Sequence, residues 1–237
     1  QLFYWAITTA QTQWNREFYA LIWNSFYLAS VTSVVVLSLA IFLAYAKRIH
    51  DHSTTNSAIK VASLGYAIPG TVIAIAVMIP LGWIDNTLDG WMRDWFGIST
   101  GLILSGTLFA LVFAYSFRFL SVALQTVDTG LNRIKPSMDE SARTLGGSRF
   151  NILKNIHLPL IQTSLLTAFI LVFVEVLKEL PTTLILRPFN FNTLSVRAYE
   201  MAADERLADA GLPALLIVVT SIIPIIILSK LIGRNHA

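Results

Sequence analysis

The chain has 237 residues, of which 55% are hydrophobic and 13% are charged, and its formal net charge is +3. Soluble domains carry about 25% charged residues, so this composition excludes an ordinary soluble domain and indicates a membrane protein. The chain contains no cysteine, which excludes disulfides, thiolate metal sites and cysteine nucleophiles.

Five long stretches lack charged residues, and each reaches the roughly 20 residues that a helix needs to cross a bilayer. Glycine and proline interrupt some of them, which membrane helices tolerate because neighbouring helices satisfy the freed backbone groups. We therefore predict an all-α membrane protein with five transmembrane helices. The predicted spans cover about 24–46, 61–82, 101–124, 158–180 and 211–230.

Residues 1–23 precede the first span, and we interpret them as an external lead-in segment to a transmembrane domain over 24–230. The chain begins with Gln1, and the following residues show neither the basic start nor the cleavage site of a signal peptide. We therefore expect the chain to be a fragment of a longer protein whose preceding part delivers this segment to the outside. Residues 231–237 form the predicted cytoplasmic tail.

Proline marks two candidate hinges. Pro69 and Gly70 lie inside the second span, and Pro181 lies at the end of the fourth. Because proline removes a backbone hydrogen bond from a helix, we predict bending at these points. Arg118 is a charged residue within the third helix, and we expect its side chain to pack against the loop helix that follows rather than to contact a ligand.

The segment 125–157, between the third and fourth spans, carries the most specific pattern. Pro136 begins a short predicted helix with acidic residues in its first turn, where they suit the helix dipole. Gly146 and Gly147 end that helix, because glycine adopts a left-handed cap without steric cost. Ser148 then caps a second helix. The sequence predicts a helix, a glycine corner and a second helix that runs into the membrane.

The distribution of Lys and Arg predicts the orientation. Loops 47–60, 125–154 and 230–237 contain ten basic residues, whereas the longer segments on the other side contain six. Cytoplasmic loops are enriched in Lys and Arg, so these three loops are predicted to be cytoplasmic. The N-terminus of this chain then lies outside and the C-terminus lies in the cytoplasm. The outer segments are acidic, which suits the entry of a cation.

Charged residues near the outer end of the fourth span are candidates for the translocation path or an outer gate. Glu175, Lys178 and Glu179 have the spacing of one helix face, so their carboxylates offer oxygen ligands to a cation while Lys178 prevents permanent capture. The alternative is a salt-bridged cluster that packs against another helix or a docked receptor. Arg187 is a candidate contact for the substrate or a docked binding protein, and its alternative role is that of an exposed loop cation.

The four histidines, His50, His52, His157 and His236, show no spacing typical of metal ligands, and we interpret them as ordinary loop residues. No pattern indicates a metal site or a nucleic-acid partner. The sequence also lacks the nucleophile-elbow and H-E-x-x-H motifs, so a membrane-embedded enzyme is not supported.

The loop resembles the EAA loop of type I binding-protein-dependent ABC importer permeases, which reads E-A-A-x3-G-x9-I-x-L-P. Serine replaces the first alanine here, and it is a mild change because small residues let another protein approach the helix backbone. The alternative is an amphipathic surface helix that happens to begin with Asp-Glu. The matching residues are Glu140, Ser141, Ala142, Gly146, Ile156, Leu158 and Pro159.

In that family the loop docks on a dimer of cytoplasmic ABC ATPase subunits and transmits its motion to the membrane helices. This chain has no G-x4-G-K-[ST] sequence, so ATP and Mg²⁺ are expected on the partner subunits, and this chain is expected to bind no cofactor and to catalyse no reaction. The resemblance also implies a periplasmic or surface substrate-binding protein and a second permease half, fused upstream or separate. It further implies the bacterial cytoplasmic (inner) membrane as the location.

Other segments look like the second half of bacterial ferric-iron transport permeases, namely 64–72, 178–189 and 199–215. This resemblance implies ferric iron as the substrate, moved by alternating access. Thiamine, sulfate, molybdate and polyamine are alternatives, because their permeases share the coupling loop. A stand-alone secondary transporter or channel is a weaker alternative, since no acidic residue lies in the middle of an uncharged stretch.

Overall fold

The computed structural model describes residues 1–49 and 52–234, and every regular element within them is a helix. Among these described residues, four helices are long and apolar enough to cross a membrane. They are Arg16–Ile49, Gly70–Phe96, Leu108–Asn132 and Leu207–Ile226. The pair Arg149–Leu160 and Gln162–Lys178, bent by 76°, makes a fifth span if it is counted as one. The prediction of an all-α membrane protein is confirmed, with four to five spans.

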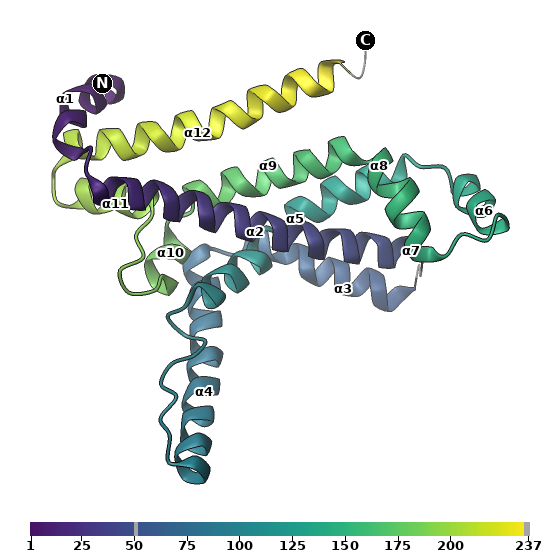
Figure 1. Cartoon of the computed structure of the whole chain (residues 1–237), viewed down its shortest axis with the longest axis horizontal. Helices are drawn as coiled ribbons and strands as arrows, with labels where there is room; N and C mark the ends of the chain where they lie inside the picture. Colours follow the sequence, from purple (N-terminus) through teal and green to yellow (C-terminus); the bar gives the residue numbers. More distant parts are fainter. Residues whose placement is uncertain (50–51, 235–237) are drawn as a thin grey trace.

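Three helices form the centre of the bundle: α2 (Arg16–Ile49), α5 (Leu108–Asn132) and α9 (Gln162–Lys178). They run along the long axis of the molecule (Figure 1) and pack against one another. The core that they form buries small residues completely, among them Ala114 and Ala168. Small side chains let helix backbones approach closely, which is how membrane helices associate without a hydrophobic driving force between them.

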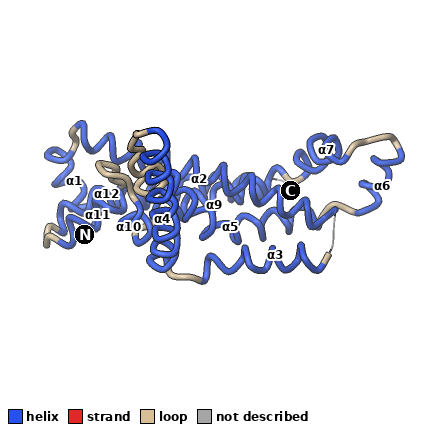
Figure 2. The backbone as a smooth tube through the Cα atoms, turned by 90° about the horizontal axis from the view of Figure 1, so that it is seen from below, coloured by secondary structure: helices blue, strands red, loops and turns tan. Residues whose placement is uncertain are grey.

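The second predicted span, 61–82, is not a single helix. α3 (Ser53–Ser63) and the 3-10 helix η1 (Leu64–Ala67) end before Pro69, and α4 (Gly70–Phe96) begins after it. Proline has no backbone donor and disfavours a helical conformation in the preceding residue, whose ψ is 133°. At this break α4 leaves the bundle and runs across the direction of the other helices (Figure 1). α3 lies beside α5 (Figure 2).

α5 begins at Leu108 rather than at the predicted residue 101. Residues 97–107 instead form a loop that folds back along α4. Asp85 in α4, which is 1% exposed, accepts hydrogen bonds from three successive backbone N–H groups of this loop at 2.7–3.2 Å. Asp89 accepts two more at 2.7 and 3.0 Å. The two carboxylates satisfy the backbone of an apolar loop, so a stretch without charges does not form a helix here.

An Asp85→Asn substitution is expected to destabilise this loop by about 2 kcal/mol, because the amide offers one acceptor oxygen and hydrogen bonds to charged groups contribute about 1.5–3 kcal/mol. Thermal unfolding of the purified protein and protease cleavage within 97–107 measure the effect. Asp94→Asn is the matched control, since Asp94 is exposed on the same helix. Equal stability of the two variants would contradict the role of Asp85.

The predicted lead-in segment 1–23 is helical and packed. α1 (Leu2–Gln13) lies against α12 (Leu207–Arg234) at one end of the bundle (Figure 1). An ideal Cβ atom on Gly211 would lie 2.8 Å from Cβ of Trp5, so this close approach of the two helices requires glycine. The segment is therefore an integral part of the helical assembly around the last span.

The end opposite α1 carries the segment that joins α5 to α9 (Figure 1). It consists of α6 (Pro136–Thr144), α7 (Arg149–Ile152), the π-helical turn η2 (Leu153–His157) and α8 (Leu158–Leu160). α10 (Pro181–Leu186) and α11 (Leu194–Ala203) follow α9 near the other end. Of the predicted tail, residues 231–234 continue α12, and residues 235–237 lie outside the described residues.

Candidate functional site

The segment between α5 and α9 has the predicted helix, corner and second helix. α6 begins with Pro136 in its first turn, and Gly146 ends it in the left-handed conformation with φ of 82°. The N–H of Gly147 donates to the carbonyl of Ala142 at 2.9 Å, which closes the helix end as in a Schellman motif. The hydroxyl of Ser148 accepts from a backbone N–H of α7. These caps confirm the predicted local structure.

The tip of this loop carries the first four residues of the EAA-type motif. Glu140, Ser141 and Gly146 are exposed, and Ala142 is half-buried. The hydroxyl of Ser141 donates to the carbonyl of Ser137 in the preceding turn at 2.8 Å. The hydroxyl of Ser141 therefore bonds within α6 and needs no partner from another chain. The exposed face of α6 stays accessible to another protein.

Two large apolar side chains outside the motif flank the glycine corner. Leu145 is 88% exposed and Phe150 is 69% exposed. Exposed apolar residues that gather at one point mark an interaction surface. Sequence reasoning did not assign them a contact role, although bulky apolar residues on both sides of a Gly-Gly corner are the signal that identifies them.

Ile156, Leu158 and Pro159 form the root of the loop rather than its tip. Ile156 lies in η2, and the other two lie in α8, directly before the 76° bend that leads into α9. Ile156 and Leu158 are half-buried, whereas Pro159 is exposed. The motif therefore has two structural parts, an exposed corner and a bent connection to the membrane helix.

Arg48, at the end of α2, ties the loop to the bundle. Its guanidinium donates to Oδ2 of Asp139 at 2.9 Å and to the carbonyls of Leu131 and Ile134 at 2.6 and 3.0 Å. Nε2 of His157 lies 2.7 Å from the other carboxylate oxygen of Asp139. Burial raises the pKa of Asp139, but the hydrogen bonds from Arg48 and His157 outweigh burial and hold that pKa below its ordinary value.

The interpretation of His157 as an ordinary loop residue is wrong. Its side chain is 1% exposed, and its ring packs edge-on against Tyr45 with centroids 5.6 Å apart. The hydroxyl of Tyr45 donates to the carbonyl of Arg149 at 2.6 Å. His157 is buried because α7 and η2 fold back onto α2. His50 and His236 lie outside the described residues.

The two predicted hinges meet in space. Pro69 precedes α4, and Pro181 stands in the first turn of α10, so both lie at breaks between helices. An ideal Cβ atom on Gly70 would lie 2.6 Å from Oε1 of Glu179 and 2.8 Å from Oγ1 of Thr182. A side chain at position 70 would therefore displace the ends of the Glu179 and Thr182 side chains. Bending during transport stays a prediction.

Arg118 links these two breaks. Its Nη1 donates to the carbonyl of Ile68 at 2.8 Å, and its Nη2 lies 3.7 Å from Oε2 of Glu179. The expectation that Arg118 packs against the following loop is wrong, because its side chain turns toward the broken second span. A charged group among membrane helices is costly unless it is paired, and Glu179 supplies the opposite charge.

The predicted common face of Glu175, Lys178 and Glu179 does not form. α9 ends at Lys178, and Glu179 has an extended backbone with ψ of 122°. Glu175 and Lys178 form an ion pair of 2.7 Å, in which the lysine side chain is 54% exposed. Glu179 is 8% exposed and points inward, where Thr182 donates to it at 2.7 Å. Glu175 and Lys178 are thus accessible candidates for the path, and Glu179 belongs to the buried cluster.

Arg187 pairs with residues near and within α11. Its Nη2 lies 3.1 Å from Oε1 of Glu200, and its Nη1 bonds the side-chain oxygen of Asn192. The alternative of a simple exposed loop cation is therefore wrong, while a contact with substrate or binding protein stays a prediction. Phe189 in the same loop is 94% exposed.

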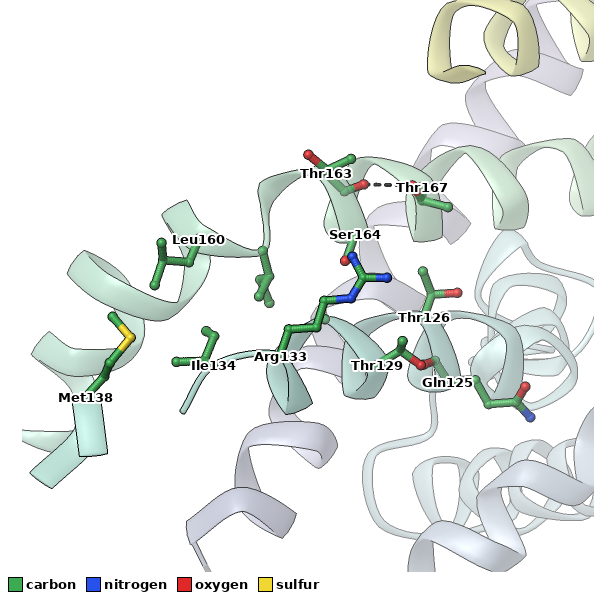
Figure 3. Close-up of a pocket in the computed structure, with 12 residues that line it drawn as sticks. Gln125, Thr126, Thr129, Arg133, Ile134, Met138, Leu160, Thr163, Ser164 and Thr167 are labelled. Carbon is green, nitrogen blue, oxygen red and sulfur yellow. Dashed lines mark hydrogen bonds between the residues drawn. The ribbon is translucent and has the colours of Figure 1, made fainter. Parts of the chain in front are cut away.

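An open cavity of about 750 Å³, lined by both polar and apolar side chains, lies between α5 and α9 where the loop joins them (Figure 3). Arg133 points into it, and the helices approach closely beside it, because an ideal Cβ atom on Gly130 would lie 2.7 Å from Oγ of Ser164. The sequence analysis did not predict this cavity. The pattern that indicates it is a set of polar residues spaced three and four apart, on one face of each apolar helix. The hydroxyl and amide side chains in its lining are Gln125, Thr126, Thr129, Thr163, Ser164 and Thr167.

The family described as "Binding-protein-dependent transport system inner membrane component" matches residues 3–236. The chain belongs to this family. Its corner at Gly146 and its apolar helices are thus parts of a transport permease component. The family and the observed fold agree with the resemblance that the loop motif indicated.

Individual relatives are about a quarter identical to this chain over the residues that align. The "Fe(3+)-transport system permease protein FbpB 2" of Haemophilus influenzae is 28% identical over 232 residues, which are 97% of this chain and 43% of that protein. The chain therefore spans less than half the length of that relative. The "Putative 2-aminoethylphosphonate transport system permease protein PhnV" of Salmonella typhimurium is 26% identical over 200 residues, with 81% of this chain and 69% of that protein covered.

The fold is also similar to that of solved transporters. A chain in the crystal structure of a bacterial ABC transporter involved in the import of the acidic polysaccharide alginate has a TM-score of 0.73 and 17% sequence identity. The match covers 98% of this chain and 83% of that chain. At this identity the likeness establishes the fold of the helical domain.

Proposed function

We propose that this chain is a membrane-spanning half of an ATP-driven importer for ferric iron that works by alternating access. The observation that carries the proposal is the exposed corner of α6 and α7, which has the EAA-type motif and is tied to α2 through Arg48 and Asp139. A force applied at the corner reaches the bundle through these bonds and through the bend at the start of α9. This arrangement suits a loop that transmits motion from a separate motor.

The motor in this proposal is a pair of cytoplasmic ATPase subunits, which bind ATP and Mg²⁺ and dock on the corner. The loop side then faces the cytoplasm and the α1 side faces outward, in a bacterial inner membrane. A substrate-binding protein delivers iron to the outer side, near Glu175 and Lys178. A second permease half, fused upstream or separate, completes the path, and this chain itself performs no covalent chemistry.

The identity of the substrate rests on the ferric relatives. Their names specify Fe(3+), and the accessible pair of Glu175 and Lys178 is compatible with a cation that passes without being held. A phosphonate is a second candidate, because the putative 2-aminoethylphosphonate permease matches more of its own length. Thiamine, sulfate, molybdate and polyamine share the coupling loop and serve as further comparisons.

Uptake by proteoliposomes that contain the whole transporter tests the proposal. With the binding protein, ATPase and ATP present, labelled ferric iron is expected to enter in preference to the phosphonate and the other comparison substrates. Glu140→Lys is expected to lower uptake at least tenfold, because it reverses a charge on the exposed docking helix. Ser141→Ala is the matched control and should retain uptake, since the serine hydroxyl bonds only its own helix.

Three results would each contradict a part of the proposal. Full uptake by Glu140→Lys would remove the corner from the coupling mechanism. Uptake that needs no ATPase subunit would indicate a secondary transporter or channel. Preferential entry of another substrate would leave the coupling mechanism in place and replace ferric iron.

A further inference from the structure

The cavity between α5 and α9 carries a positive charge that no neighbouring acidic residue of the described chain neutralises. Among its described lining residues, Arg133 alone carries a formal charge. The two acidic residues nearest to it in sequence turn the other way. Asp128 pairs with Lys47 of α2 at 2.8 Å, and Asp139 pairs with Arg48 of α2 at 2.9 Å.

The guanidinium of Arg133 is available to a ligand. In the described part of the chain its side chain takes part in no hydrogen bond or ion pair. It points into the space framed by Thr126, Thr129 and Ser164 (Figure 3). Five N–H donors in a planar fork match the geometry of a carboxylate, phosphate or phosphonate. Ser164 adds a hydroxyl that can also donate.

The same lining disfavours a bare metal cation. Hard cations are bound by carboxylate and carbonyl oxygens, and the described lining of this cavity contains no carboxylate. A guanidinium directed at the ligand would repel a trivalent ion. The size of the cavity lies within the range of about 300–1,000 Å³ that small-molecule sites occupy.

We propose that this cavity binds a solute oxyanion, a phosphate-like or carboxylate group that travels through the transporter free or bound to ferric iron. The proposal rests on the proposed function. It adds that the transported solute carries a negatively charged group when it passes the end of the bundle that bears the loop. Met138 of α6 and Ile161 at the bend before α9 also line the cavity. The cavity therefore borders both the loop and the bend that leads into α9.

Calorimetric titration with inorganic phosphate tests the site directly. The permease, assembled with its ATPase subunits and purified in detergent without ATP, is titrated with phosphate at constant ionic strength. Saturable binding is expected, with at least tenfold weaker affinity in Arg133→Gln. Arg133→Lys should be intermediate, because it keeps the charge and loses the planar fork. Lys60→Gln is the matched control, since Lys60 is an exposed cation that does not line the cavity, and its affinity should equal that of the unaltered protein.

Equal phosphate affinity in Arg133→Gln, or no saturable binding, would overturn the proposal. Retention of anionic phospholipid that depends on Arg133, without phosphate binding, would overturn it too, because the site would then hold a lipid headgroup. Arg133 is exposed, so its variants should keep the unfolding temperature of the parent protein. The titration measures binding without transport. If iron uptake fails, the proposed function is overturned, and the phosphate-binding result still stands.

Discussion

Arg48→Gln is expected to lower coupled uptake at least tenfold while the chain still inserts in the membrane. Arg48 makes three hydrogen bonds to the end of α5, the turn that follows it and α6, and its side chain and that of Asp139 are each 14% exposed. Removing one partner of a buried ion pair costs about 3–5 kcal/mol, because the other charge stays buried without compensation. Asp139 would keep only its bond to His157, and α6 would lose its attachment to α2.

The effect is measured as binding-protein-stimulated ATP hydrolysis and iron uptake by the reconstituted transporter. We expect uptake to fall at least tenfold and hydrolysis to lose its dependence on the binding protein, since the loop can dock without moving the bundle.

Lys47→Gln is the matched control, one residue away on the same helix. Lys47 pairs with Asp128 of α5, and these side chains are 34% and 27% exposed. Pairs that are this accessible contribute about 0–1 kcal/mol, so this variant should transport nearly as well as the parent. Similar losses in both variants would show that the inner end of α2 needs positive charge in general, and would contradict the specific role of Arg48.

The predictability of this loop follows from the range of the interactions that form it. The proline start, the glycine corner and the serine cap are set by residues within a few positions, so the sequence predicts them correctly. The attachment of Asp139 to Arg48 joins residues 91 positions apart, and no local pattern contains it. The burial of His157 has the same origin, because it depends on α7 and η2 folding onto α2.

The predicted spans fail where a local feature overrides composition. Pro69 divides the second span, although an uncharged stretch reads as one helix. Asp85 of α4 accepts hydrogen bonds from the backbone of the loop before α5, so this apolar segment folds back along α4 and does not form a helix. The fourth span ends at Lys178 because Pro181 has no N–H to donate and its ring would clash with the carbonyl of Leu177 in a continued helix. The predicted span included Glu179 in the helix, so the sequence placed its side chain beside Glu175 and Lys178 and not toward the interior.

The pairing of Arg118 with Glu179 predicts a non-additive effect of substitution. Arg118→Leu should leave Glu179 with Thr182 as its remaining side-chain partner, and Glu179→Leu should leave Arg118 with its hydrogen bond to the carbonyl of Ile68 and no opposite charge beside it. Each single change is expected to cost about 3–5 kcal/mol, because it strands a buried charge. The double variant removes both charges together, so it should be more stable than the sum of the single effects by about 2 kcal/mol or more.

The free energies of unfolding of the three variants in detergent measure this coupling, and Lys178→Gln supplies the control from an ion pair whose lysine side chain is 54% exposed. The double variant also separates stability from transport. If Arg118 and Glu179 only hold the helices together, the double variant should regain uptake in proportion to the stability that it regains. We expect uptake to stay low, because Arg118 and Glu179 join the breaks at Gly70 and Pro181, and apolar side chains cannot tie one helix end to the other. Strictly additive energies would show that the 3.7 Å contact carries no interaction, and full uptake by the double variant would show that the two breaks need no polar link to move together.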